Sequence, residues 1–127
     1  MGSWDYSSIT IRPSGDVREI NADLTEPILF VESSNNAILI DGRIDEIGSG
    51  NQLTFSNSSG PAINIDNYDY SSALENVTLK HLNLKGVVES ATPGIVNVLS
   101  HASTATTGID IENLKIGNPN GNAAHGI

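Results

Sequence analysis

The sequence predicts an all-β protein that winds as a single-stranded parallel β-helix, with three short strands in each coil of roughly 30 residues. Three observations lead to this prediction. First, apolar and polar residues alternate in short runs, which is the pattern of β-strands. Second, a spacing of 32 residues recurs, because it separates Ile63 from Ile95 and Ile95 from Ile127. Third, some neighbouring runs are joined by only two polar residues, which is typical of the sharp corner of a coil.

The clearest repeat consists of the stretch 77–86 and a similar stretch at 109–117, offset by 32 residues. Each contains two apolar-polar-apolar strands joined by a polar kink. His81 and Asn113 occupy equivalent kink positions. Because asparagine tolerates a left-handed backbone, we expect both residues to form corners rather than to act in catalysis.

The first strands are predicted from runs of alternating apolar and polar residues that are bounded by turn residues. Residues 9–11 alternate and end at a turn, 12–16, which contains proline and glycine. Residues 17–20 form a second short strand. The continuous apolar run at 28–31 is expected to form the next strand. Residues 38–40 follow a polar corner.

The later strands repeat this scheme after a longer polar excursion at 42–52. The expected strands are 53–55, 62–65, 77–79, 82–84, 95–98, 109–111 and 114–116. Helical periodicity is absent over any 11 residues, so no long helix is expected, although 71–76 could form one helical turn.

Aligned on the repeat, the strands predict about three to four coils. The first complete coil is expected to have strands near 28, 38 and 53, the second near 63, 77 and 82, and the third near 95, 109 and 114. The strands at 9 and 20 belong to a partial coil before them. An antiparallel β-sandwich also has many short strands, but it has no reason to keep a 32-residue register.

Composition limits the class of partner. The chain has 127 residues, enough for one domain, with 38% hydrophobic and 5% aromatic residues. The formal net charge of −9 disfavours nucleic acid and anionic membrane surfaces, which are bound through lysine and arginine. Cysteine is absent, which excludes disulfides, and no apolar run is long enough for membrane insertion.

The chain is expected to form one domain over 4–127, with 1–3 read as a start introduced for expression. Ile127 would open a new coil, so the domain is interpreted as a fragment of a longer solenoid. Open coil ends leave strand edges unpaired, and self-association through them is expected.

Four stretches, 9–15, 37–43, 51–59 and 108–117, resemble right-handed parallel β-helix regions of large surface proteins from Bacteroidetes-type bacteria. The resemblance rests on turn glycines and strand alternation and covers most of the chain. It implies a right-handed coil and a secreted or cell-surface location. It implies no catalytic set.

Acidic residues are the first candidates for a site, because polysaccharide-cleaving enzymes use clustered carboxylates. The acids considered are Asp41, Asp45, Glu46, Asp66, Asp69, Asp110 and Glu112. Asp41, Lys80 and Glu112 align at equivalent positions and are expected to form a solvated charge column on the outside. No catalytic residue is assigned.

A binding edge is expected from Asp66, Tyr68, Asp69 and Tyr70, with His101 in the equivalent loop one coil on. Tyrosine rings offer flat faces to sugars, and the acids could bond hydroxyl groups or a calcium ion. The alternative is a plain surface loop. The histidines lack a spacing with acids that would indicate a metal site.

The function expected from the sequence is a structural or adhesive β-solenoid segment of a secreted or cell-surface bacterial protein. The alternative is a carbohydrate-binding or polysaccharide-cleaving module, with a surface glycan as its partner. The spacing matches no known catalytic motif, so an enzyme is disfavoured.

Overall fold

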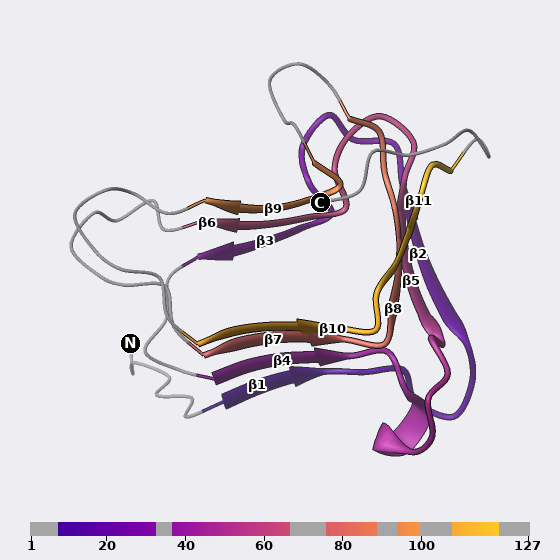
Figure 1. Cartoon of the computed structure of the whole chain (residues 1–127). Helices are drawn as coiled ribbons and strands as arrows, with labels where there is room; N and C mark the ends of the chain where they lie inside the picture. The colour runs from indigo at the N-terminus through magenta and orange to yellow at the C-terminus, as the bar shows by residue number, and fades with distance from the viewer. Residues whose placement is uncertain (1–7, 33–36, 67–75, 89–93, 100–107, 120–127) are drawn as a thin grey trace, which may run out of the picture.

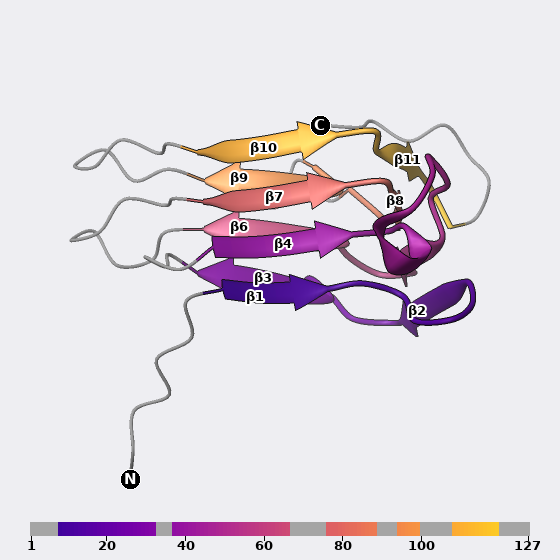
Figure 2. The same ribbon diagram turned by 90° about the horizontal axis from the view of Figure 1, so that it is seen from below.

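The computed structural model describes residues 8–32, 37–66, 76–88, 94–99 and 108–119. All eleven strands in these ranges belong to three parallel sheets, as in a parallel β-helix. Figure 1 looks down the stack and shows two sheets facing one another, with the third closing one side of the core. Figure 2 shows the strands stacked at successive levels from β1 to β10.

Sheet A is formed by the strand that opens each turn. Its order is β1 (Ser8–Ile11), β4 (Ala37–Asp41), β7 (Val77–Lys80) and β10 (Ile109–Glu112). Sheet B follows it in the chain, in the order β2 (Arg18–Ala22), β5 (Leu53–Asn57), β8 (Leu82–Lys85) and β11 (Lys115–Gly117). Sheet C completes the turn with β3 (Leu29–Glu32), β6 (Ile63–Asp66) and β9 (Val96–Leu99).

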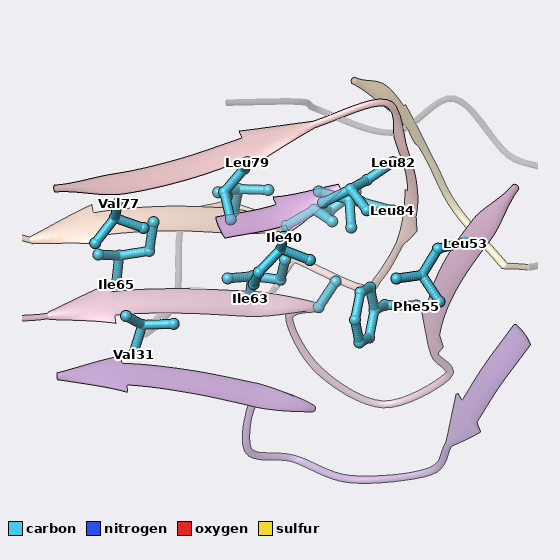
Figure 3. Close-up of a cluster of buried hydrophobic side chains, with 13 residues drawn as sticks. Val31, Ile40, Leu53, Phe55, Ile63, Ile65, Val77, Leu79, Leu82 and Leu84 are labelled. Carbon is cyan, nitrogen blue, oxygen red and sulfur yellow. The ribbon is translucent and has the colours of Figure 1, made fainter. Parts of the chain in front are cut away.

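The core lies between the three sheets and is made almost entirely of aliphatic side chains. Strand alternation sends every second residue inward, so that Val77 and Leu79 of β7 are fully buried and Thr78 and Lys80 are only partly covered. Figure 3 shows how side chains from the three sheets meet in one cluster. Its labelled members are Val31, Ile40, Leu53, Phe55, Ile63, Ile65, Val77, Leu79, Leu82 and Leu84.

The predicted 32-residue register is confirmed in sheets A and B. Val77 pairs with Ile109 in sheet A, and Asn83 pairs with Lys115 in sheet B. The partial coil predicted at the start is also confirmed, because β1 pairs with β4 and β2 pairs with β5. Each predicted strand is present within one or two residues of its expected bounds.

The predicted register of sheet C is wrong by one residue, because Ile63 pairs with Val96 and not with Ile95. The carbonyl of Ile95 instead accepts both the Ala62 N–H, at 2.9 Å, and the Ile63 N–H, at 3.2 Å. Two residues therefore oppose one, as at a bulge. Ile95 stays fully buried, but at the corner before β9 rather than stacked on Ile63. Leu29, not Ile28, is likewise the partner of Ile63 in β3.

One short 3-10 helix, η1 (Ile44–Glu46), lies in the excursion at 42–52 and is the sole helix in the described ranges. The expected helical turn at 71–76 lies outside the described residues except for Asn76, and so does Ile127. No helix in the ranges that the structure describes has the length and apolar character needed to cross a membrane.

Candidate functional site

Charged and polar groups gather at the corner where sheet A turns into sheet B. We call this the charged corner and define it by Asp41, Arg43, Lys80, His81 and Glu112. The corner is close to η1, where the chain leaves β4 in Figure 1.

The turn itself is built by two residues with left-handed backbone. His81 joins β7 to β8 at φ 54°, and Asn113 precedes β11 at φ 53°. The prediction that both are corner residues is therefore confirmed. Left-handed backbone is favourable for asparagine and costs more for histidine, so the fold must hold His81 in place by other contacts.

Gly42 provides the equivalent turn one level below and is required by a close backbone approach. A Cβ atom on Gly42 would lie 1.8 Å from the carbonyl oxygen of His81. The Gly42 N–H donates to the Lys80 carbonyl at 2.9 Å, and the His81 N–H donates to the Glu112 carbonyl at 3.2 Å. Three successive levels are thus hydrogen-bonded through the corner.

Asp41 is the central charged group of the corner, and its side chain is 0% exposed. Arg43 reaches back to it and donates from Nη2 to Oδ2 at 2.6 Å and from Nε to Oδ1 at 3.0 Å. The Arg43 backbone N–H also donates to Oδ1, at 3.1 Å. Lys80 Nζ lies 3.7 Å from Oδ2. This carboxylate is therefore paired in the fork geometry that stabilises a buried charge.

Burial alone would raise the pKa of Asp41, but the hydrogen bonds and charge of Arg43, with the charge of Lys80, outweigh it and lower the pKa below its ordinary value. The same contacts, led by the hydrogen bond to Asp41, raise the pKa of Arg43. Asp41 is thus held in its ionised form, which suits an ion pair and not a proton donor.

The predicted charge column is confirmed in its register, since Asp41 pairs with Lys80 and Lys80 pairs with Glu112. The expectation that the whole column is solvated is wrong for Asp41, because Arg43 covers it. Arg12 extends the column downward, since it follows Ile11, which pairs with Ile40. Charges along this column alternate in sign from one level to the next.

The excursion at 42–52 is fixed along the corner by side-chain hydrogen bonds. Asn51 Nδ2 donates to the carbonyls of Leu82 and Asn113, both at 2.9 Å, and so joins two levels above its own. Asn83 Nδ2 returns a bond to the Asn51 carbonyl at 2.8 Å. The Ile44 N–H donates to Gln52 Oε1 at 3.0 Å. The excursion at 42–52 therefore links successive levels of the stack, and we call it the clip.

An open groove of about 280 Å³ lies beside this clip. It is lined by Ser49, Asn51, Asn113, Leu114 and Lys115. The lining combines a hydroxyl, amides and an ammonium group with the apolar face of one leucine.

His81 Nδ1 is one of two buried side-chain polar atoms without a hydrogen-bond partner in the described ranges, the other being Asn64 Oδ1. The His81 residue is 7% exposed. Sequence reasoning recognised its corner position but gave no sign that the ring would be buried.

Of the predicted binding residues, the structure describes Asp66 alone. Asp66 ends β6, is nearly buried, and pairs in register with Glu32 and Leu99. The other four, Tyr68, Asp69, Tyr70 and His101, lie outside the described residues. The predicted binding edge therefore stays a prediction.

Arg43 is the corner residue that sequence reasoning missed. It stands two residues after Asp41, and an acid followed closely by an arginine across a glycine was the available signal. Asn57 was also missed. It is fully buried, accepts the Leu24 N–H at Oδ1 at 3.0 Å, and donates from Nδ2 to the Glu26 and Pro61 carbonyls at 2.9 Å.

Within the described ranges, no group of three or more histidine, cysteine or acidic side chains is arranged to hold a metal ion. A scan of family models, a search of curated proteins and a search of solved structures each find no match to this chain.

Proposed function

We propose that this chain is a structural β-solenoid segment of a secreted or cell-surface bacterial protein, serving as a stalk or an adhesive surface. We further propose that its coil is right-handed, with three complete turns and two strands of a fourth. The proposal rests on one observation above others, which is the continuous parallel pairing of sheets A and B from the first described strand to the last.

The chemistry of the charged corner supports this proposal. A catalytic carboxylate needs a proton to give or a free lone pair to use. Asp41 has its oxygens occupied by Arg43 and stays ionised, so its contribution is to hold the corner together. Gly42 and Asn51 likewise serve backbone packing and hydrogen bonding between levels.

The test compares binding and cleavage on one purified sample. The chain is placed on a glycan array and incubated with soluble polysaccharides, with reducing ends measured over time. A stalk gives neither signal, whereas array binding alone indicates an adhesive surface or the carbohydrate-binding role described next. Release of oligosaccharides would overturn the proposal if the activity stays with the protein after a second purification.

A carbohydrate-binding role is a second candidate, favoured by the groove beside the clip. The Ser49 hydroxyl and the Lys115 ammonium group suit sugar hydroxyls, and Leu114 offers an apolar contact. Ser49→Trp fills the groove and should abolish array binding. Ser14→Trp, on the exposed first turn, is the matched control and should leave binding unchanged. Equal binding by both variants would exclude the groove as the site.

A further inference from the structure

The first end of the stack exposes residues that occupy core positions inside it, and the corresponding residues at the other end, Ile109, Leu114 and Ile116, are only partly buried. In the described part of the chain, β1 and β2 are the outermost strands at one end, and β10 and β11 at the other. Ile9 is 44% exposed and Ile20 is 43% exposed. At the first end, an open apolar depression of about 180 Å³ is lined by Ile9, Ile11, Leu29, Phe30, Val31, Ile38 and Ile40.

The backbone edges at the two ends are complementary. The carbonyls of Gly108 and Glu112 accept bonds from the Val77 and His81 N–H groups. By alternation, the polar groups of Ile109 and Ile111 therefore face the edge of β10 that no other described strand pairs with. At the level of β4, the Ile38 and Gly42 N–H groups donate to the carbonyls of Asn76 and Lys80 on the β7 level. The same parallel pattern turns the Thr10 N–H to the free edge of β1. The outer edges of β1 and β10 therefore carry backbone N–H and C=O groups in the alternation that parallel pairing of a further strand requires.

The register inside the molecule fixes which side chains would meet if a second copy continued the stack. Ile9 aligns with Ile38, Val77 and Ile109 in turn, so β1 of a second copy would place its Ile9 on Ile109. Continuing that register places Thr10 on Asp110 and Ile11 on Ile111. Apolar residues meet apolar residues on the inner face.

Charges on the outer face also match under this register. Arg12 of the second copy would follow Glu112 and continue the alternating charge column. In sheet B, Glu19 pairs with Thr54, Thr54 with Asn83, and Asn83 with Lys115. Glu19 of the second copy would therefore lie on Lys115. Both contacts join opposite charges, and cross-strand pairs of opposite charge are favourable.

We propose that the β1–β2 end of one copy adds in parallel to the β10–β11 end of a second copy, so that copies stack head to tail. The two surfaces differ, so the contact is heterologous and does not close on itself. Linear stacks that lengthen with concentration are the expected product. This inference rests on the register of sheets A and B and does not depend on the proposed function.

One residue opposes the contact and sets its strength. Arg18 occupies the register position of Leu53, which faces the core, and its Nη2 donates to the Ser14 carbonyl at 3.3 Å. In a stack, Arg18 would lie on the level above Leu114. A charge directed at an apolar level weakens association, as inward charges on edge strands do in general.

The decisive experiment uses engineered cysteines, because the native chain has none. Thr10→Cys and Asp110→Cys are made as separate proteins and oxidised alone and as a mixture. Neighbouring strands lie about 4.8 Å apart, within the Cα separation of about 4.4–6.8 Å that a disulfide requires. The mixture should give a crosslinked dimer, and each protein alone should not. Crosslinking of either protein alone in preference to the mixture would overturn the head-to-tail arrangement.

A concentration series tests the same contact without crosslinks, by light scattering and sedimentation. The wild-type mass should rise steadily with concentration. Lys115→Glu should shift this rise to at least several-fold higher concentration, and Lys115→Glu combined with Glu19→Lys should restore it. Arg18→Leu should move the rise to lower concentration. A strict monomer for both the wild type and Arg18→Leu would overturn the proposal, as would failure of the charge swap to rescue.

Thr10→Pro removes one edge N–H without touching the bonds between β1 and β4. It should reduce association, whereas Thr10→Ala keeps the N–H and should not. Circular dichroism verifies that each variant is folded. Equal association of the two variants would exclude strand addition at β1.

Discussion

The inner and outer levels of the stack use the same residue types with opposite results. Ile40 in β4 is 0% exposed, whereas Ile9 in β1 of the same sheet is 44% exposed. Their strands are paired to one another, with Ile9 opposite Ile38 and Ile11 opposite Ile40. Burial is therefore conferred by the neighbouring levels and not by the strand itself, as expected for a solenoid. Three pairs of variants and one pH series test this contrast.

The largest difference should come from truncating a buried isoleucine of an inner strand and an exposed isoleucine of the outermost strand. Ile40→Ala should cost about 2–5 kcal/mol of unfolding free energy, because it leaves a cavity in a packed core. Ile9→Ala should cost only about 1 kcal/mol, because much of its surface is already in water. Urea denaturation followed by circular dichroism measures both. Equal losses would show that the ends are as well packed as the middle.

Glycine replacement gives the next largest contrast. Gly42→Ala should cost about 1–3 kcal/mol, since the added methyl group meets the His81 carbonyl and the backbone must move. Gly117→Ala, on the outer level, has open space around its Cβ position and should change stability by about 0.5 kcal/mol or less. The same denaturation assay applies. A tolerated Gly42→Ala would contradict the close approach at the corner.

Loss of a buried ion pair should likewise cost more stability than loss of an exposed one. Asp41→Asn should cost about 1–3 kcal/mol, because it removes the partner of Arg43 inside the corner. Glu46→Gln removes the exposed pair with Arg12, which has a 3.0 Å separation, and should cost less than about 1 kcal/mol. Thermal unfolding of the two variants side by side provides the measurement. A larger loss from Glu46→Gln would refute the ranking.

The smallest expected effect is in the dependence of stability on pH. The pKa of Asp41 is lower in the folded protein than its ordinary value, so its contribution is complete above about pH 4 and is lost as the pH falls further. Hydrogen bonds from Ser59 and Ser58 lower the pKa of exposed Asp23 in the same direction. Urea midpoints between about pH 3 and pH 7 should therefore fall at the acidic end. Asp41→Asn should reduce this fall without removing it.

Much of the fold could be predicted because it repeats. Alternation placed the strands, and the 32-residue spacing fixed the pairing of Val77 with Ile109. The register of sheet C could not be predicted in the same way. Ile95 and Val96 are both apolar, so alternation does not decide which of them pairs with Ile63. The bulge-like step at Ile95 depends on hydrogen bonds that no pattern in the sequence reveals.

The site was harder to predict than the fold. Asp41 was placed correctly in its column, but its burial depends on the side chain of Arg43 folding back over it. That arrangement follows from the path of the chain after Gly42 and not from the identity of the strand residues. Most of the predicted binding edge lies outside the described residues, and its role remains a prediction.

The clip formed by Asn51 has a consequence for how the molecule opens. A solenoid can fray from its ends one level at a time, because each level contacts only its neighbours. The Asn51 amide reaches the carbonyls of Leu82 and Asn113, so the last corner cannot detach without breaking a bond from a residue two levels below it. Amide hydrogen exchange near Asn113 should therefore resemble that of the interior, and Asn51→Ala should let this end exchange on its own.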